Sequence, residues 1–282
     1  MSVTTLVAAG DDVEITGDPD ARYPIYSITK TAVAAAVLLL VRDGAVELDS
    51  VRRLLDHTSG VRDYGSLPEY HEAVRTQPGS PWDDDEFLAR TAAAGAQFQP
   101  GEGWAYSNTG YLLLRRLLDE HGGLAGFLPR LGLPNARVAE RSDDLGAAVP
   151  APSELLLDGV ADVRGVYDPR WVGHRTLIAR AGDLVGFWRD LPAEMLDPGS
   201  FVPIGFEAPG FVRPCYGLGV MADPEHELGT VVGHGGGGPG YATAVFAVPR
   251  TGVLAIVLAA DERYPAQQRA LELLTAAVSR LP

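Results

Sequence analysis

Lysine occurs once in this sequence, at Lys30, and arginine supplies the rest of the 23 lysine and arginine residues. A guanidinium does not lose its proton in a protein, whereas a lysine amine does so once it is desolvated or lies beside suitable groups. Ser27 precedes Lys30 by three residues at a predicted helix start, which places both side chains on one face. The amine is then able to take up the serine proton and activate a weak nucleophile. A serine cap followed by an exposed lysine fits the pair equally well.

A second group, Tyr106 and Asn108, follows a proline–glycine loop at residues 98–103. A phenol beside an ammonium group has its pKa lowered and is able to act as general acid and base. The asparagine amide is able to hold a substrate amide or the lysine amine. The same Tyr-x-Asn spacing is also common in capping turns, so the pair alone does not decide between the two interpretations.

A glycine-rich stretch follows a predicted strand in the last third of the chain. Glycines at that position let a substrate lie against the backbone, whose free N–H groups form half of an oxyanion hole. A flexible turn is the alternative interpretation. A phosphate-binding loop is excluded because the Gly-Lys-Ser/Thr ending is missing. The stretch reads Gly233-His234-Gly235-Gly236-Gly237-Gly238-Pro239-Gly240-Tyr241.

Several helices must position these groups. The pattern predicts a long helix over 28–42, which is apolar on every face and therefore buried on all sides. A second helix ends within residues 54–60, and residues 61–81 are predicted to be loop. Acidic residues at 83–85 mark the first turn of another helix, where the helix dipole favours them. Further helices are predicted over 108–119, 177–191 and 265–280, and residues 120–170 are left unassigned.

The strands define the fold class. A hairpin is predicted at residues 3–8 and 12–16, and strands at 216–221, 229–233, 241–248 and 253–258; short turns between consecutive strands indicate an antiparallel sheet. We therefore predict an α and β protein with this sheet flanked by helices, plus a mostly helical region. In this division residues 1–50 and 176–282 form the sheet-containing region, and residues 51–175 form the helical one. Together they build one catalytic unit, with the site in the cleft between them.

Composition narrows the classes of function. With 282 residues, 46% of them hydrophobic, the chain is able to bury a large core. A net charge of −14 and a pI near 4.8 argue against nucleic acid and anionic membranes as partners. The sequence lacks both an apolar run of about 18 residues and a secretory signal pattern. The single cysteine, Cys215, is interpreted as a semi-buried thiol; it excludes an internal disulfide, so a cytoplasmic location is expected.

Taken together and in this order, the motifs resemble those of the serine β-lactamase and penicillin-binding-protein superfamily. The branch that they resemble most contains class C β-lactamases, DD-peptidases and related esterases. The resemblance covers about residues 13–282, with supporting stretches at 54–60, 98–101 and 216–219. The motifs are Ser27-Ile28-Thr29-Lys30, Tyr106-Ser107-Asn108 and His234-Gly235-Gly236, the last in place of the Lys-Thr-Gly of many members.

What the resemblance implies is an acyl-enzyme mechanism that needs neither a metal nor an organic cofactor. Ser27 attacks a carbonyl carbon, and Lys30 and Tyr106 exchange the serine proton. Tyr106 then delivers a proton to the leaving group. Water, or another nucleophile, afterwards removes the acyl group from the serine.

The resemblance also assigns the binding residues. Asn108 orients the substrate and the lysine amine, and His234 lines the opposite wall of the cleft. The backbone N–H groups of Ser27 and Gly237 form the oxyanion hole, and Gly236 belongs to the same substrate-binding stretch.

The remaining candidates have structural interpretations. His57 is predicted to bond to backbone beneath the site rather than to act as a base. Trp104 is predicted either to line the cleft or to pack within the fold. Four histidines without a motif around them are predicted to be ordinary surface or loop residues: His71, His121, His174 and His226.

One departure from the family pattern bears on the substrate. Gly235 stands where many relatives carry threonine, and the motif lacks a lysine, so the anchor for a substrate carboxylate is weakened unless Arg175 or Arg213 replaces it. We therefore predict a serine hydrolase, an esterase or amidase, that acts on a small ester, amide or lactam. The alternatives are an acyltransferase, a β-lactamase or DD-peptidase, and a non-catalytic binding protein. The presence of every reacting residue argues against the last of these.

Overall fold

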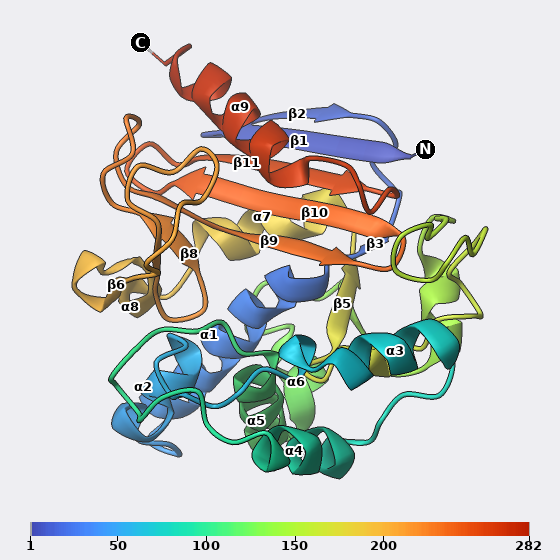
Figure 1. The fold of residues 1–282 in the computed structure, drawn as a ribbon. Coiled ribbons are helices and arrows are strands. Elements are labelled where there is room, and N and C mark those ends of the chain that lie inside the picture. Colours follow the sequence, from blue (N-terminus) through green and yellow to red (C-terminus); the bar gives the residue numbers. More distant parts are fainter. Residues whose placement is uncertain (1, 282) are drawn as a thin grey trace.

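Residues 2–281 are described in this computed structural model, and within them eight strands form one antiparallel sheet (Figure 1). The N-terminal hairpin pairs with the last strand, so both ends of the chain contribute to one sheet. The spatial order is β2 (Asp12–Thr16), β1 (Val3–Ala9), β11 (Val253–Ala259), β10 (Tyr241–Val248), β9 (Val231–Gly238), β8 (Met221–Asp223), β7 (Cys215–Tyr216) and β6 (Val202–Pro203).

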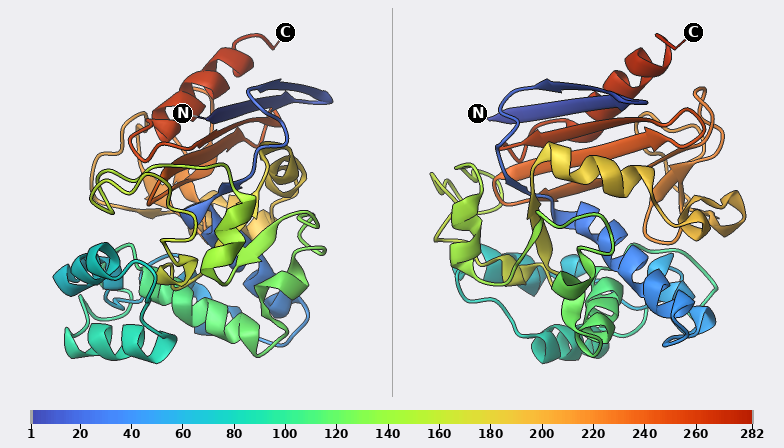
Figure 2. Two further views of the ribbon diagram at one scale, coloured as in Figure 1. Left: turned by 90° about the vertical axis from the view of Figure 1, so that its right-hand side faces the viewer. Right: turned by 180° about the vertical axis from the view of Figure 1, so that it is seen from behind.

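Strands β10 and β11 are buried along their whole length because helices cover both faces of the sheet. Alternate residues such as Phe246 and Val257 pack beneath α9 (Ala266–Val278), and the intervening ones such as Val245 face the main core. Figure 2 shows α9 on one face and α7 (Ala181–Arg189) on the other. Burial on both faces explains why these strands are apolar without alternation.

The other helices form a layer against one side of this sheet (Figure 1). At its centre lies α1 (Thr29–Arg42), whose alanine, valine and leucine side chains are buried on nearly every face. No helix within residues 2–281 is long and apolar enough to cross a membrane. The remaining helices are α2 (Leu48–Leu55), α3 (Pro68–Thr76), α4 (Asp84–Ala93), α5 (Asn108–Asp119), α6 (Gly123–Phe127) and α8 (Ala193–Leu196).

Short elements connect these layers. A second sheet has the order β3–β5–β4, and β5 lies beside the start of α1. Its strands are β3 (Tyr23–Pro24), β4 (Arg137–Ala139) and β5 (Thr176–Ala179). The 3-10 turns are Tyr26–Ile28, Tyr64–Ser66, Ser142–Ala147, Pro169–Trp171 and Pro198–Ser200.

Side-chain caps fix the starts of two helices. Ser107 Oγ accepts a hydrogen bond from the backbone N–H of Gly110 at 3.0 Å, and Asp83 accepts one from Glu86 N–H at 2.8 Å. Each cap satisfies a backbone donor that has no partner within its helix. The Ser107 cap also places its two neighbours in sequence at the N-terminus of α5.

The predicted fold class is confirmed: an antiparallel sheet built from the first hairpin and the final strands is flanked by helices. Three local predictions are wrong. Residues 61–81 contain α3, which begins with a proline in its first turn, rather than loop alone. The predicted helix over 177–191 is β5 followed by α7, because residues 176–179 pair with two distant strands. The single strand over 216–221 is β7 and β8 joined by a turn.

Candidate active site

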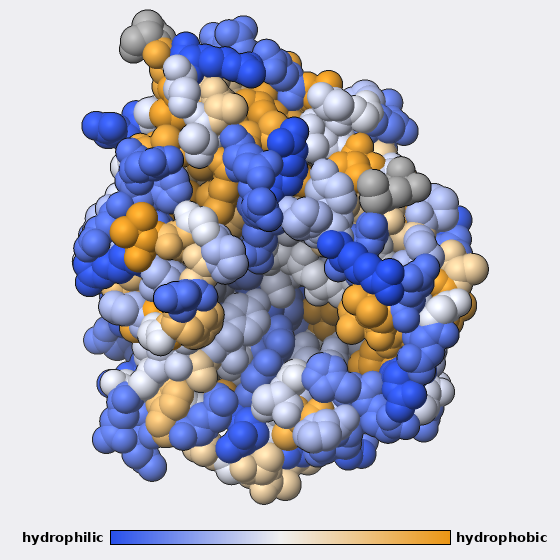
Figure 3. All heavy atoms as spheres, turned by 45° about the horizontal axis from the view of Figure 1, so that its top comes forward, coloured by the Kyte–Doolittle hydropathy of each residue, from blue (hydrophilic) through white to orange (hydrophobic). Residues whose placement is uncertain are grey.

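Two hollows meet where the sheet faces the helical layer, and the space-filling view shows this face indented near its centre (Figure 3). The first, here the aromatic pocket, has a volume of about 440 Å³; its lining includes Ser27, Trp104, Tyr106, Phe206, Tyr216 and His234. The second, here the polar pocket because its lining holds the charged residues Asp63, Glu72 and Arg75 beside Asn108, has a volume of about 670 Å³; the rest of its lining is largely apolar or aromatic and includes Tyr26, Tyr70, Leu155 and Leu156. Gly237 of strand β9 lines both pockets, so the two pockets meet at this strand.

Ser27 lies in a 3-10 turn that leads into α1, and its position is set by its neighbours. Tyr26 adopts a φ of 45°, a conformation that is unfavourable for a residue with a side chain. Its backbone N–H donates to Thr176 Oγ1 at 2.8 Å, and its hydroxyl donates to the carbonyl oxygen of Pro239 at 2.7 Å. Thr29 Oγ1 accepts from Leu177 N–H at 2.9 Å. Strand β5 and the β9–β10 turn therefore hold the serine in place.

Lys30 is fully buried in the first turn of α1, directly behind Ser27. Its Nζ lies 3.1 Å from Ser27 Oγ and 2.7 Å from Asn108 Oδ1. Burial lowers the pKa of this amine well below its usual value, and the nearby Asp63 carboxyl opposes that shift. A deprotonated amine within hydrogen-bond distance of a serine hydroxyl is able to accept its proton.

Asn108 connects the lysine to a buried acid. Its backbone N–H donates to Asp63 Oδ1 at 2.9 Å, and its side-chain Nδ2 donates to Asp63 Oδ2 at 3.2 Å. These bonds orient the amide so that its oxygen faces Lys30. Burial raises the pKa of Asp63, and hydrogen bonds from the backbone of Gly65 and Asn108 partly offset that rise.

Tyr106 lies one residue before the α5 cap and two residues before Asn108. The centroid of its ring is 4.8 Å from Lys30 Nζ. Burial raises the pKa of the phenol, and a hydrogen bond with Ser27 opposes that rise. The prediction that a neighbouring ammonium lowers this pKa is therefore wrong, because removal from water dominates. The phenol is neutral at physiological pH and is able to donate a proton.

The sheet side of the cleft is formed by β9. His234 is buried; its Nδ1 donates to the carbonyl oxygen of Gly235 at 2.6 Å, and its Nε2 accepts from the Tyr216 hydroxyl at 3.0 Å. Burial is the main cause that lowers the pKa of His234 to about 3, so the ring is neutral. A Cβ on Gly236 would collide with the carbonyl oxygen of Ile25. The glycines thus allow the strand to approach the serine turn closely.

His57 fills the structural role predicted for it. Its Nδ1 accepts the backbone N–H of Ser107 at 3.1 Å, beneath the tyrosine of the second motif. Its φ of 63° and complete burial mark a rigid, specialised turn. Burial lowers the pKa of His57, so the ring is neutral and does not bring a second cation beside Lys30. Trp104 lines the aromatic pocket.

The prediction that His174 is an ordinary surface or loop residue is only partly right. It lies in a turn, but its side chain is buried and its Nε2 lies 3.2 Å from Lys30 Nζ. Asp63 is a second residue of the site that sequence reasoning missed. Asp63 and His174 both lie in irregular backbone, and neither belongs to a motif that the sequence analysis singled out. One available signal was that a single buried amine needs more than one polar neighbour.

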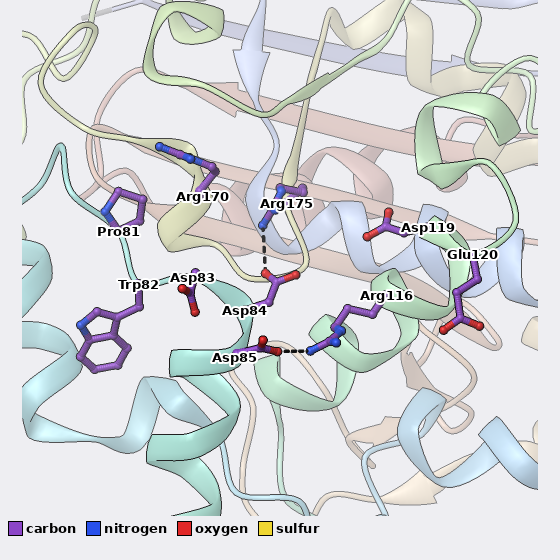
Figure 4. A pocket seen from close by; sticks show the side chains of 10 residues that line it. All are labelled: Pro81, Trp82, Asp83, Asp84, Asp85, Arg116, Asp119, Glu120, Arg170 and Arg175. Carbon is purple, nitrogen blue, oxygen red and sulfur yellow. Dashed lines mark hydrogen bonds and ion pairs between the residues drawn. The ribbon is translucent and has the colours of Figure 1, made fainter.

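Neither arginine proposed as a replacement anion anchor lies in the cleft. Arg175 lines a separate cavity, where its guanidinium lies 3.8 Å from an oxygen of Asp84 (Figure 4). Arg213 pairs with Glu225 at 2.9 Å on the surface. That prediction is wrong because consecutive residues in the turn before β5 diverge: His174 faces Lys30, and Arg175 lines the other cavity.

Comparison with known proteins identifies the family. The penicillin-binding protein 4* of Bacillus subtilis is 26% identical over 264 residues, which cover 78% of this chain and 56% of that protein. A D-aminopeptidase of Cereibacter sphaeroides is 26% identical over 247 residues, covering 78% of this chain and 46% of that protein. The chain thus spans about half the length of these curated relatives.

A solved structure agrees over nearly the whole chain. The D-stereospecific amidohydrolase from Streptomyces sp. superposes with a TM-score of 0.85 and 25% identity, covering 98% of this chain and 94% of that one. The model of the family described as Beta-lactamase matches residues 50–279, well over half of the chain. This chain therefore belongs to the Beta-lactamase family.

Proposed function

We propose that this protein is a serine hydrolase that forms an acyl-enzyme on Ser27 and cleaves a small amide or ester. The observation that carries the proposal is the 3.1 Å contact of Ser27 Oγ with the buried Lys30 amine, whose pKa burial lowers. A neutral amine at that distance is a suitable base for a serine hydroxyl. Membership of the Beta-lactamase family supports the same reaction class.

In the proposed reaction, Ser27 Oγ forms a bond to the substrate carbonyl carbon while Lys30 takes the hydroxyl proton. The backbone N–H groups of Ser27 and Gly237 stabilise the oxyanion. When the bond to the leaving group breaks, Tyr106 gives that nitrogen or oxygen a proton. The proton held by Lys30 then restores the phenol. Water repeats these steps on the ester and releases the acid.

The two pockets suggest which part of the substrate lies where. Tyr106 lines the aromatic pocket, so a leaving group that it protonates lies there, and the acyl group lies beside Asn108 in the polar pocket. Within the described part of the chain, Glu207 is the one residue lining the aromatic pocket with a formal charge at neutral pH, because His234 is neutral. A leaving group bearing a carboxylate therefore finds no cation there, which argues against β-lactams and D-alanyl peptides.

For the acyl part we propose a D-amino acid, which makes the substrate a D-amino acid amide. Two observations support this. The names of the relatives include D-aminopeptidase and D-stereospecific amidohydrolase. The carboxyl group of Asp63 lines the polar pocket, where it suits a free ammonium group, whereas Glu72 of the same pocket already pairs with Arg75.

Two coarser features complete the proposal. Residues 1–50 and 176–282 act with residues 51–175 as one catalytic unit, since Ser27 and His234 belong to the first set and Tyr106 and Asn108 to the second.

We also propose a cytoplasmic location, which the single cysteine supports and cell fractionation tests.

Intact mass spectrometry with a fluorophosphonate tests the nucleophile. We expect one adduct on the wild type and none on Ser27→Ala; a folded wild type that stays unlabelled would overturn the proposal. Turnover of paired D- and L-amino acid p-nitroanilides, a p-nitrophenyl ester and nitrocefin then tests the substrate class. We expect the D-anilide to be cleaved fastest, and faster nitrocefin hydrolysis would move the assignment to a β-lactamase.

A further inference from the structure

We infer that the aromatic pocket binds an aromatic ring carried by the amine leaving group, and that Phe206 is the specificity-determining residue for this ring. The inference rests on the proposed function, because it takes Tyr106 as the acid that protonates the departing nitrogen. The substrate is then a secondary amide whose amine part bears an uncharged aromatic ring, rather than a primary amide that releases ammonia.

Phe206 differs from the other aromatic residues in its exposure to solvent. It is 59% exposed, whereas every other phenylalanine, tyrosine and tryptophan between residues 2 and 281 is buried or half-buried. Phe206 lines the same pocket as Ser27. Gly205, directly before it, has a φ of 77°, a conformation that favours glycine. Folding alone leaves this ring in contact with water, so a ligand in the pocket is able to cover it.

The surface on which Phe206 packs is itself aromatic. The centroid of its ring lies 5.8 Å from that of Trp104, and Trp104 lies 6.0 Å from the ring of Tyr216. Tyr216 in turn lies 6.2 Å from the ring of Tyr106, at an angle of 83°. Aromatic rings attract each other at these separations in tilted and edge-to-face arrangements. A row of rings therefore runs from the exposed Phe206 to the phenol, and a substrate ring bound along it gains the same kind of contact.

The size and the remaining lining of the pocket fit such a ring. Its volume of about 440 Å³ lies in the range of small-molecule sites. A molecule the size of water takes up about 30 Å³, so an ammonia leaving group would leave most of the pocket filled with water. Glu207 disfavours a negatively charged ring. Apolar side chains that complete the lining, and that favour displacement of this water by a ring, are Ile204, Ala208, Pro209 and Met221.

The loop that carries Phe206 is fixed at its base by contacts that do not involve the ring. The backbone N–H of Ile204 donates to the carbonyl oxygen of Pro214 at 3.1 Å. The buried Asp223 carboxylate accepts from the backbone N–H of Val212 at 2.6 Å. Phe206→Ala should therefore remove the ring and keep the loop. The side chain of Val212 is 66% exposed and lies outside the lining of the pocket, so Val212→Ala is the matched control.

Three amides of D-alanine test the inference: the primary amide, the benzylamide and the amide formed with L-phenylalanine amide. Benzylamine and ammonia are similar in basicity, so the ratio of kcat/KM for the benzylamide to that for the primary amide reports binding of the ring. We expect a ratio of about 10 or more in wild type, a fall of about 10-fold in Phe206→Ala, and the wild-type ratio in Val212→Ala. Faster cleavage of the dipeptide amide would identify the ring as that of an amino acid, and faster cleavage of the benzylamide as that of an arylalkylamine.

Two further measurements separate failure of the inference from failure of the proposed function. Labelling of Ser27 by a small alkyl fluorophosphonate releases fluoride, so its rate should be the same in wild type, Phe206→Ala and Val212→Ala. The neutral fragment N-benzylacetamide, titrated by NMR against protein that carries Ser27→Ala, should bind about 10-fold more weakly when Phe206→Ala is added.

The outcomes are distinct. An enzyme that is labelled at Ser27 but has no preference for the ring, or keeps that preference in Phe206→Ala, would overturn the inference and leave the proposed function in place. Binding of the fragment that depends on Phe206, without labelling of Ser27 in any form, would support the ring site and overturn the proposed function. Absence of both labelling and fragment binding would overturn both.

Discussion

The two walls of the cleft contribute to the site in different ways, one mainly through side chains and the other mainly through backbone. On the helical wall, Lys30 and Asn108 bring chemistry through side chains, and a buried carboxyl behind them fixes their orientation. On the sheet wall, β9 offers mainly backbone, and its glycines let that backbone approach the serine turn. The helical wall therefore depends on its polar side chains, whereas the sheet wall depends on the absence of side chains at its glycines.

This difference divides the expected effects of substitution. Changes on the helical wall alter proton transfer and should appear in the rate and its pH dependence. Changes on the sheet wall add volume and should shift the backbone. A substitution on the sheet wall that changed the pH dependence without moving the backbone would show that the two walls do not have separate roles.

Replacing the lysine is the strongest test of the helical wall. Lys30→Arg keeps the positive charge but supplies a group that does not act as a base. We expect acylation to fall by about 10²- to 10⁴-fold, the usual contribution of general base catalysis. The measurement is the rate of fluorophosphonate labelling, with circular dichroism and the melting temperature as controls for folding. Turnover close to that of wild type would rule out the proton-relay role.

A single methyl group tests the sheet wall. In Gly236→Ala the new Cβ collides with the carbonyl oxygen of Ile25 and lies 2.5 Å from Thr243 Oγ1, so β9 must move away from Ser27. We expect kcat/KM to fall by up to about 100-fold for a displacement near 1 Å. Gly235→Ala is the matched control, since its Cβ meets the flexible end of the Gln267 side chain. Similar losses in both variants would show that the close approach at Gly236 is not what matters.

Substitutions that change the charge near Lys30 with little change in side-chain volume distinguish effects on its pKa from effects on packing. Asn108→Asp places a second carboxyl beside Lys30, which stabilises the ammonium form and raises its pKa. Because the neutral amine is the active form, the acidic limb of the pH–rate profile should move to higher pH. Asp63→Asn removes an anion and should move that limb to lower pH. Shifts in the same direction for both variants would contradict an electrostatic coupling between these groups.

The sequence analysis succeeded for the regular helices and strands and failed for the irregular segments between them. The apolar helix that became α1, the capped helix α5 and the strands β10 and β11 have strong local patterns, and their predicted bounds are confirmed to within a few residues. The motif residues Ser27, Tyr106 and His234 carry chemistry in recognisable spacing, and the structure brings them to one cleft.

What could not be predicted depends on contacts between distant segments. Strand β5 is defined by its pairing with β3 and β4, which its own residues do not reveal. Asp63 and His174 belong to the site only because the loops after α2 and before β5 converge on Lys30. Arg175 has the charge of an anion anchor, but the direction of its turn places it in a separate cavity beside Asp84. Local patterns specify elements, whereas this constellation is specified by tertiary packing.

Both walls share one feature, a neutral buried imidazole, and it gives the smallest of the expected effects. Burial is the largest cause that lowers the pKa of His57 and His174 on the helical side and of His234, to about 3, on the sheet side. In the unfolded chain these rings titrate near pH 6.5. Between that pH and the folded pKa values the unfolded state binds more protons, so stability present above about pH 6.5 is lost as the pH falls.

The slope of that loss distinguishes the buried rings from exposed ones. Each ring contributes up to about 1.4 kcal/mol per pH unit to the free energy of unfolding within its window. Urea titrations at pH 7.5, 6.5 and 5.5 should give a falling free energy for wild type and a shallower fall for His234→Gln. The exposed His121→Gln is the matched control and should keep the wild-type slope. An unchanged slope in His234→Gln would mean that this ring is already protonated in the folded protein, and the sheet wall would then offer the cation that a carboxylate-bearing leaving group requires.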